Sequence, residues 1–182
     1  MCRNFDKSYL RIAREIGSRS YARRHKVGCI IVKDGQIISD GFNGTPAGFD
    51  NNCEDTVGCK LEFENWHDKI SCCKILTDES GYKYKHIKPC CEWCNCENAI
   101  LKTKPEVLHA EANAITKLAK SHSSGDNATL YVTLSPCFDC AKLIKQSNIK
   151  KVIFQELYRS SDGIEFLKKA GIEVEQIENI DE

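Results

Sequence analysis

The sequence has little that would direct the protein to a membrane or to a polyanion. Its 182 residues contain no apolar run of membrane-spanning length, and residues 1–10 are charged and lack a small-residue cleavage site. Lysine and arginine total 26, as do aspartate and glutamate, so there is no net charge to attract nucleic acid. We therefore expect a cytoplasmic protein (in the host cytoplasm if the chain is viral), with neither a membrane nor a nucleic acid as partner.

Cysteine, in contrast, is abundant, and its distribution is uneven. Eight of the 12 cysteines lie between residues 53 and 96. Without a secretory signal, metal ligation accounts for them better than disulfide bonds. Residues 53–105 also lack sustained hydrophobic periodicity, which is unusual for so long a segment in a compact domain. We predict a single domain, residues 1–182, with a Cys-rich insert at about 53–105 whose small core is built on metal.

Outside this insert, the hydrophobic pattern predicts helices that alternate with strands. The expected helices cover residues 4–17, 109–119, 136–146 and 162–171, the last capped by Asp162, and the expected strands cover 27–33, 36–42, 128–134, 151–155 and 172–177. Asp34-Gly35 is a strong signal for a hairpin between the first two strands. A hairpin followed by β-α-β crossovers predicts an α/β fold, a three-layer arrangement with a five-stranded mixed sheet and helices on both faces.

Two short motifs in the second half of the chain carry the chemistry. His109 is followed two residues later by Glu111, and Pro136 precedes Cys137-x-x-Cys140. This combination, H-x-E…P-C-x-x-C, is the general signature of zinc deaminases. Three protein ligands leave a zinc ion one open position for water, and zinc lowers the pKa of that water. A carboxylate beside it can then transfer protons.

Neither motif is specific by itself. A Cys-x-x-Cys pair fits a redox or structural zinc motif equally well, and a lone histidine is more often structural. The combination, at the starts of two helices separated by a strand, favours an open catalytic site. The alternative is a closed structural zinc site in which Glu111 is a solvated surface charge.

Two segments of the first half are candidates for binding a nucleotide. Residues 18–26, SRSYARRHK, form either a solvated loop or a phosphate-binding segment that uses Arg19, Arg23, Arg24 or Lys26. Residues 41–51, GFNGTPAGFDN, form a Gly-rich loop after the second strand, where backbone N–H groups and an asparagine could hold a ligand.

At these residues the sequence resembles the cytidine/deoxycytidylate deaminase superfamily, and most closely its deoxycytidylate (dCMP) deaminases. VGCIIVKDGQIISDGFNGTPAG is similar to the first hairpin of that family with its Asn-Gly-x-Pro-x-Gly loop, which is the specific part. HAEANAI and LYVTLSPCFDCAKLI resemble the two zinc motifs, and IKKVIFQELY with LKKAGIEV resembles the closing β-α-β unit.

The resemblance implies roles for individual residues. Catalytic zinc would be held by His109, Cys137 and Cys140, and Glu111 would be the proton shuttle. The nucleotide would be contacted by Asn43 at the sugar and by Tyr158 near the phosphate, with Ala110 and Ser135 as further substrate-binding residues. Effector or phosphate-binding candidates are Arg19, Arg23, Arg24, Gly41, Phe42, Gly44 and Gly48. In the family dCTP activates and dTTP inhibits, Mg²⁺ can accompany the effector, and homohexamers are common.

Microbial and phage members of the family also bind a structural zinc after the Gly-rich loop. The resemblance and the knuckle spacing of one Cys-x-x-Cys pair suggest a site made of Cys53, Cys59, Cys91 and Cys94. The sequence departs from the family pattern in length, because it carries more cysteines here than one site needs.

We therefore expect an enzyme that hydrolyses dCMP to dUMP and ammonia and so supplies dUMP for dTTP synthesis. A variant that also accepts dCTP remains open. A different class, a zinc-ribbon-like module that binds nucleic acid through the insert, is disfavoured by the acidic residues there.

Overall fold

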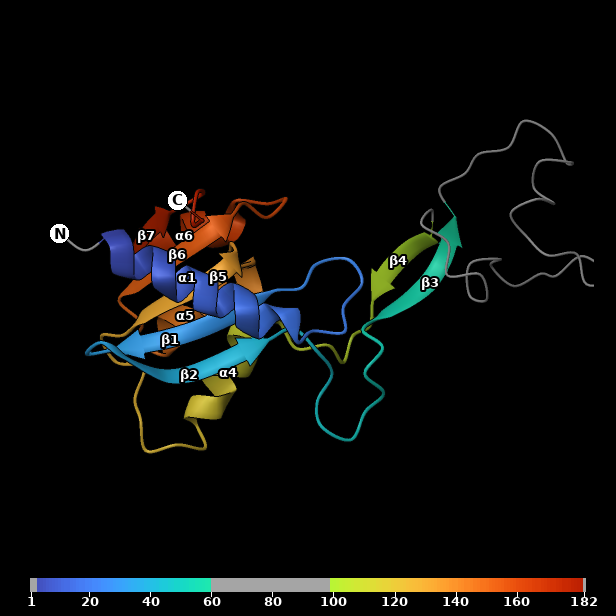
Figure 1. The fold of residues 1–182 in the computed structure, drawn as a ribbon, viewed down its shortest axis with the longest axis horizontal. Coiled ribbons are helices and arrows are strands. Elements are labelled where there is room, and N and C mark those ends of the chain that lie inside the picture. Colours follow the sequence, from blue (N-terminus) through green and yellow to red (C-terminus); the bar gives the residue numbers. More distant parts are fainter. Residues whose placement is uncertain (1–2, 60–98, 182) are drawn as a thin grey trace, which may run out of the picture. The chain divides into compact units, whose positions relative to one another are not determined.

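The computed structural model describes residues 3–59 and 99–181. The chain divides into two compact units, residues 1–53 with 106–182 and residues 54–105. The larger unit carries every element that the hydrophobic pattern predicts (Figure 1). The prediction of one domain with an insert at 53–105 stays a prediction.

A five-stranded mixed sheet forms the centre of the larger unit. Its strands are β1 (Gly28–Lys33), β2 (Gln36–Phe42), β5 (Thr129–Leu134), β6 (Lys151–Glu156) and β7 (Glu173–Gln176), in the order β2-β1-β5-β6-β7. β1 is antiparallel to both β2 and β5, whereas β5, β6 and β7 are mutually parallel. Asp34 and Gly35 have φ values of 51° and 78°, as a tight two-residue hairpin turn requires. The predicted mixed sheet is confirmed.

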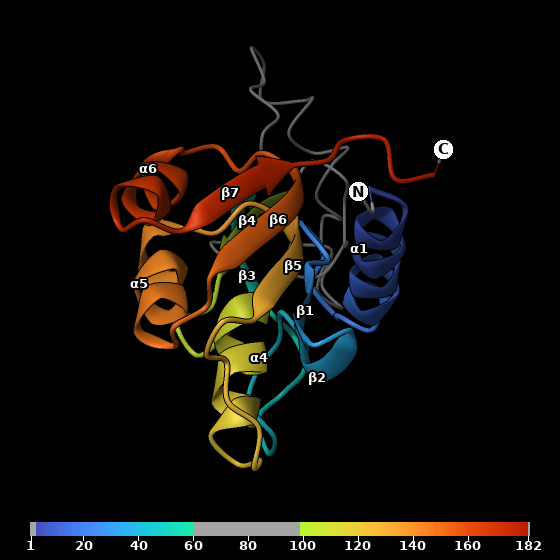
Figure 2. The ribbon, with the colours of Figure 1, turned by 90° about the vertical axis from the view of Figure 1, so that its left-hand side faces the viewer.

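Helices cover the two faces of this sheet (Figure 2). α1 (Arg3–Ser18) lies on one face, and α4 (Ala110–Leu118), α5 (Phe138–Gln146) and α6 (Asp162–Lys169) lie on the other. The alternation along β1 accounts for the two cores. Cys29 and Ile31 belong to the cluster of the three-helix face, whereas Ile30 and Val32 belong to the cluster of the α1 face. The predicted three-layer arrangement is therefore confirmed.

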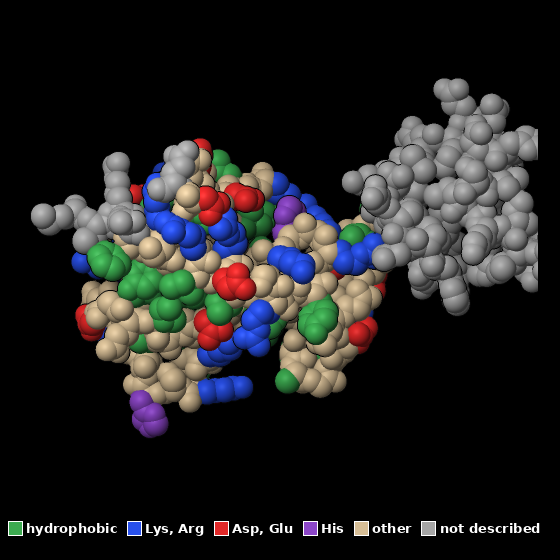
Figure 3. All heavy atoms as spheres, in the orientation of Figure 1, with side chains coloured by type: hydrophobic (Ala, Val, Ile, Leu, Met, Phe, Trp, Pro, Cys, Tyr) green, Lys and Arg blue, Asp and Glu red, His purple; other side chains and the backbone are tan. Residues whose placement is uncertain are grey.

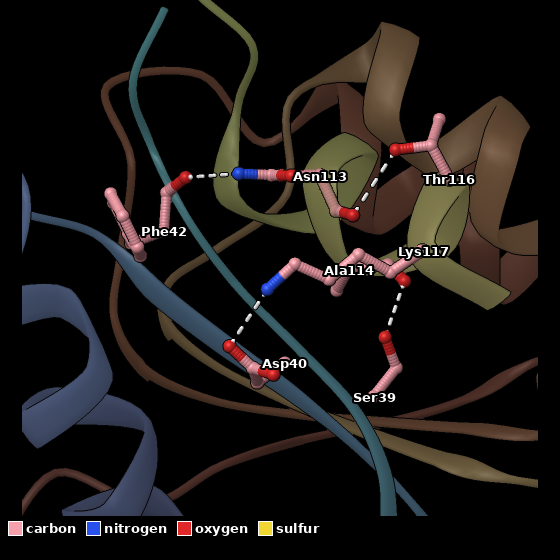
Figure 4. A network of polar contacts seen from close by, with 7 residues as sticks. All are labelled: Ser39, Asp40, Phe42, Asn113, Ala114, Thr116 and Lys117. Atoms are coloured by element: carbon pink, nitrogen blue, oxygen red, sulfur yellow. Dashed lines mark hydrogen bonds and ion pairs between the residues drawn. The ribbon is translucent and has the colours of Figure 1, made fainter. Parts of the chain in front are cut away.

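Helix α4 is attached to β2 by side chains of both elements (Figure 4). Ser39 donates a 2.6 Å hydrogen bond to the carbonyl of Ala114, and Lys117 pairs with Asp40 at 2.9 Å. Gly41 allows the close approach, because a Cβ there would lie 2.3 Å from the carbonyl oxygen of Ala110. These contacts fix the helix that begins at the first zinc motif.

The last residues of the chain pack on the α1 face. Ile180 is 1% exposed and joins the cluster that contains Leu10 and Ala13. Asp181 accepts two hydrogen bonds, of 2.6 and 2.7 Å, from the guanidinium of Arg14.

The smaller unit contains a strand pair that the hydrophobic pattern did not predict. β3 (Glu54–Cys59) is antiparallel to β4 (Ala99–Thr103), with an irregularity between Thr56 and Gly58. Neither segment shows a clean alternation of apolar and polar residues, so its pairing could not be read from its sequence.

Two helix starts differ from the prediction in detail. Ser161, not Asp162, occupies the N-cap position of α6, and its hydroxyl donates to Glu165 at 2.7 Å. α5 begins at Phe138, after Pro136, with Cys137 at its N-cap position. Across the described ranges, no helix is long and apolar enough to cross a membrane.

Candidate catalytic zinc site

The first zinc motif lies at the start of α4. His109 occupies the N-cap position in an extended conformation (φ −70°, ψ 156°), and its side chain makes no capping hydrogen bond. Glu111 lies in the first turn and is 4% exposed, although it is ionisable. Burial of a carboxylate is costly, and such residues are seldom found inside a protein without a function. Glu111 is therefore not the solvated surface charge of the alternative interpretation.

The second motif lies at the start of α5. β5 ends at Leu134, and the extended turn that follows places Cys137 at the N-cap position and Cys140 one turn later. N–H groups at a helix N-terminus favour the thiolate form of cysteine. Gly163 of α6 permits this turn, because a Cβ there would lie 2.1 Å from the carbonyl oxygen of Pro136.

The structure brings the three predicted ligands together. The Nδ1 atom of His109 lies 3.4 Å from Sγ of Cys137 and 3.5 Å from Sγ of Cys140. In a tetrahedral zinc site with bonds of about 2.3 Å to sulfur and about 2.0–2.1 Å to nitrogen, the N···S separation is about 3.5 Å. The donor set therefore fits zinc in both chemistry and spacing. It is also the one metal-ligating cluster of three or more residues among the parts of the chain that the structure describes.

The protonation of the two thiols is coupled. Hydrogen bonds from the Cys140 thiol and from His109 lower the pKa of Cys137 to about 4. The hydrogen bond to Cys137 and burial raise the pKa of Cys140 far above its ordinary value. Without a cation, one thiolate is thus stabilised by a proton retained on its neighbour. A zinc ion would replace that proton, because metal binding requires the deprotonated ligands.

Glu111 has the protonation behaviour of a proton carrier. Burial raises its pKa to about 7, and the neighbouring His109 offsets part of this shift. A carboxyl with a pKa near the working pH can both accept and release a proton.

The Gly-rich loop reaches the same helix start. Gly44 and Leu108 form an isolated antiparallel bridge, with N–H···O distances of 3.1 and 2.9 Å. Leu108 directly precedes His109, so this loop lies beside the first zinc motif. The predicted sugar contact of Asn43 stays a prediction. In this structure its side-chain amide makes hydrogen bonds to the protein backbone. Its Oδ1 accepts from the Val27 N–H, and its Nδ2 donates to the His25 carbonyl, each at 2.8 Å.

The other predicted substrate-binding residues lie around the second motif and α4. Ser135 is 3% exposed, and its hydroxyl accepts a 2.8 Å hydrogen bond from the backbone N–H of Tyr158. Tyr158 is half-buried, with the Arg159 guanidinium 5.3 Å from its ring centroid. Ala110 is fully buried in the core beneath the site. These contacts describe positions, and the substrate roles stay predictions.

The predicted effector residues divide into two kinds. Arg19 lies over the Phe42 ring at 5.4 Å, and Arg23 and Arg24 are exposed. Gly41 and Gly48 have structural roles, the first as a close packing contact with α4 and the second through a φ of 96°. Gly44 pairs with Leu108, as described above. An effector site here stays a prediction.

Sequence reasoning did not single out Asn113 and Gly163. Asn113 lies in α4 and donates a 3.0 Å hydrogen bond from Nδ2 to the Phe42 carbonyl, which attaches the catalytic helix to the Gly-rich loop (Figure 4). The signal that could have identified Asn113 is a polar residue within the helix that carries the first motif. Gly163 had none, because its contact with Pro136 depends on how α6 packs.

The predicted structural zinc set stays a prediction. Cys53 is buried and directly precedes β3, and Cys59 is the last residue of that strand. Cys91 and Cys94 lie outside the described residues.

Comparison with known proteins identifies the family. Residues 3–156 match the model of the cytidine and deoxycytidylate deaminase zinc-binding region. The chain belongs to the cytidine and deoxycytidylate deaminase family. The deoxycytidylate deaminase of Enterobacteria phage T4 is 39% identical over 175 residues, which cover 91% of this chain and 86% of that protein. The predicted enzyme class, a zinc-dependent deaminase, is thus confirmed.

Solved structures agree with this assignment. The dCMP deaminase of the cyanophage S-TIM5, in complex with dCMP and dUMP, is 35% identical, with a TM-score of 0.70 over 97% of this chain and 99% of that chain. A diaminohydroxyphosphoribosylaminopyrimidine deaminase/reductase of Thermotoga maritima shares the fold at 22% identity, with a TM-score of 0.56 over 94% of this chain and 36% of that chain. Because that protein is named for a different substrate, the fold alone does not define what the site accepts.

Proposed function

We propose that the chain hydrolyses the 4-amino group of dCMP to give dUMP and ammonia. The observation that carries this proposal is the His109–Cys137–Cys140 cluster with the buried carboxyl of Glu111 beside it. The phage T4 and S-TIM5 relatives, both dCMP deaminases by name, support the substrate. The product would feed dTTP synthesis.

Each side chain has a distinct task in this proposal. His109, Cys137 and Cys140 would hold zinc, which supplies a water of lowered pKa when bound. Glu111 takes one proton from the attacking water and delivers it to the ring nitrogen. It then takes the second proton from the hydroxyl formed at C4 and delivers it to the amino group, so that the C4–N bond breaks, C4 becomes a carbonyl and neutral ammonia leaves. Its burial excludes bulk water from this transfer, and the hydrogen bonds of α4 to β2 hold it in place.

The finer features rest on the resemblance. We infer activation by dCTP and inhibition by dTTP at the Gly-rich loop, with Mg²⁺ accompanying the effector, and assembly into a homo-oligomer. A structural zinc in the insert would use Cys53, Cys59, Cys91 and Cys94, and we place the protein in the cytoplasm, that of the host if it is viral.

The deciding experiment is ultraviolet-monitored deamination with deoxycytidine, dCMP and dCTP offered separately, each with and without dTTP. Turnover of dCMP alone, suppressed by dTTP, is the expected result. If zinc-loaded protein turns over none of them, the proposed function is wrong.

A second candidate is a deaminase that accepts both dCMP and dCTP. It is favoured by the exposed basic side chains of residues 23–26, which could contact additional phosphates. Turnover of both nucleotides in the same experiment would establish it. The nucleic-acid module has less support, since basic and acidic side chains are interspersed over the face in Figure 3 and form no stripe of one sign among the described residues there.

A further inference from the structure

We infer that Asn43 and Ser20 are positioning residues that hold the basic segment, residues 18–26, beside the catalytic helix, so that discrimination for a 5′-phosphate depends on them. This inference rests on the proposed function, because a phosphate-bearing nucleotide is the ligand that a basic segment at this place would recognise.

Asn43 is bound to the end of the basic segment through its side chain and its backbone together. Oδ1 accepts from the Val27 N–H, and Nδ2 donates to the His25 carbonyl, both at 2.8 Å. The Asn43 N–H also donates to the Val27 carbonyl at 3.1 Å. The amide thus extends the β1–β2 ladder with a side chain that mimics a peptide unit.

Ser20 holds the beginning of the segment from inside the protein. It is 2% exposed, and its hydroxyl donates a 2.6 Å hydrogen bond to the Asn43 carbonyl. The same oxygen accepts from the Ala22 N–H at 3.1 Å, and Ala22 is 4% exposed. Residues 23–26, which lie between Ala22 and Val27, are exposed and all basic. A loop fixed at both ends loses less conformational freedom when a ligand binds.

The residues on either side of Asn43 are attached to the catalytic helix. The Phe42 carbonyl accepts from Nδ2 of Asn113 in α4, and Gly44 pairs with Leu108, which directly precedes His109. The Arg19 guanidinium lies over the Phe42 ring. Asn43 therefore connects the basic segment to the helix start that carries the first zinc motif.

This geometry separates two roles for Asn43. A residue that contacted only the sugar would affect nucleosides and nucleotides alike. A residue that positions the basic segment would affect the phosphate-bearing ligand more. Ser20 separates the roles further, because its hydroxyl is bonded to the Asn43 carbonyl and to the Ala22 N–H and so acts on the segment through these two bonds.

The test measures dUMP and deoxyuridine as competitive inhibitors of dCMP turnover by the zinc-loaded protein. The ratio of their inhibition constants reports the contribution of the phosphate, even if the nucleoside is not a substrate. We expect Ser20→Ala and Asn43→Ala each to lower this preference for dUMP by about three- to tenfold, as expected for one or two lost hydrogen bonds. Ser20→Thr, which keeps the hydroxyl, should restore most of it.

The matched control is Ser147→Ala, which lies outside the basic segment. The Ser147 hydroxyl donates to the Leu143 carbonyl at the end of α5 instead of bridging to Asn43, so the preference for dUMP should equal that of the wild type. Limited trypsin digestion gives a second readout that needs no activity. Cleavage after Arg23, Arg24 and Lys26 should accelerate several-fold in Ser20→Ala and Asn43→Ala, but not in Ser147→Ala.

Three outcomes are distinct. A wild-type protein that does not deaminate dCMP contradicts the proposed function, and the trypsin rates still test the attachment of the segment. Equal losses for dUMP and deoxyuridine in Asn43→Ala would make Asn43 a sugar contact and overturn the inference. An unchanged preference in Ser20→Ala, with zinc content and thermal unfolding as in the wild type, would overturn it as well.

Discussion

His109 and Glu111 lie two residues apart at one helix start, but their surroundings differ. His109 is exposed, whereas Glu111 is 4% exposed. Burial gives the carboxyl its raised pKa and keeps it close to the reacting atoms. The difference shows how one short motif supplies both a metal ligand and a proton carrier.

Removal of the carboxylate should separate metal binding from turnover. We expect Glu111→Gln to keep its zinc and to lose about 10²- to 10⁴-fold in kcat for dCMP, because an amide of the same shape cannot transfer the protons. Metal analysis and ultraviolet-monitored deamination measure the two properties. Glu178→Gln, which changes an exposed carboxyl outside the site, is the control. Normal turnover by the Glu111→Gln enzyme would contradict the proton-transfer role of Glu111.

Zinc binding should depend on pH with a definite sign. The zinc-free site retains a proton on Cys140, whose pKa is raised by its hydrogen bond to Cys137 and by burial. Zinc uptake near neutral pH should therefore release about one proton or more, and zinc affinity should fall as the pH decreases. Calorimetry in buffers of different ionisation enthalpy measures the proton release. Zinc retention that does not change between about pH 8 and pH 5 would contradict the assigned ligands.

At this scale the sequence predicted the ligands but not the hydrogen-bond partners. His109, Cys137 and Cys140 belong to two short motifs, and the combination of these motifs predicted that the three side chains would lie together. The partners of Asn43 and Ser135 are backbone groups of distant segments, and residue type alone does not indicate them. The strand β3, which ends at Cys59, was not predicted, and the zinc-binding roles of Cys53 and Cys59 stay predictions.

At the scale of elements, the site lies where helices begin. α4 and α5 begin at the two zinc motifs, and the start of α6 packs against the turn before α5. The helices and the five central strands were predictable, because apolar periodicity and the Asp34-Gly35 turn are local features of the chain. β3 and β4 were not, because their pairing joins segments that are distant in the sequence and lack an alternating pattern.

A methyl group at Gly163 should disturb the second zinc motif. In Gly163→Ala the new Cβ would lie 2.1 Å from the Pro136 carbonyl oxygen and 2.9 Å from the Cys137 carbonyl carbon, so α6 or the ligand turn must shift. We expect roughly 1–3 kcal/mol of destabilisation from overpacking, with weaker zinc retention in chelator competition. Gly44→Ala is a steric control, because its Cβ would meet only the Phe42 ring, at 3.6 Å or more. Equal zinc retention in the two variants would contradict the packing argument.

At the scale of the larger unit, the sheet separates the catalytic face from the α1 face. The zinc motifs begin helices of the three-helix face, whereas the chain end packs with α1 on the other. Stability and activity should therefore respond to different residues. Length predicted one domain with a core, and the order of helices and strands predicted helices on both faces, but neither indicated that residues 177–181 would complete the α1 cluster.

Ile180→Ala should test this separation. Loss of a 1% exposed side chain should lower the free energy of unfolding by about 2–5 kcal/mol. The kcat and KM of the folded enzyme for dCMP should stay close to the wild-type values, since the change lies on the face away from the zinc motifs. Urea unfolding and steady-state kinetics measure the two. Asp181→Asn, which weakens an exposed ion pair, should have a much smaller effect on unfolding. A large change in kcat would show that the faces are coupled.

The Gly44–Leu108 bridge has a consequence for how such a chain can change over generations. It joins the two residues that flank residues 45–107, so the start of the catalytic helix is held by a contact that does not involve that stretch. The entropy of closing a flexible loop grows only with the logarithm of its length, by about 0.6 kcal/mol per doubling. Insertions, deletions and replacements between these two residues can therefore accumulate in evolution while the catalytic residues that begin at His109 are kept.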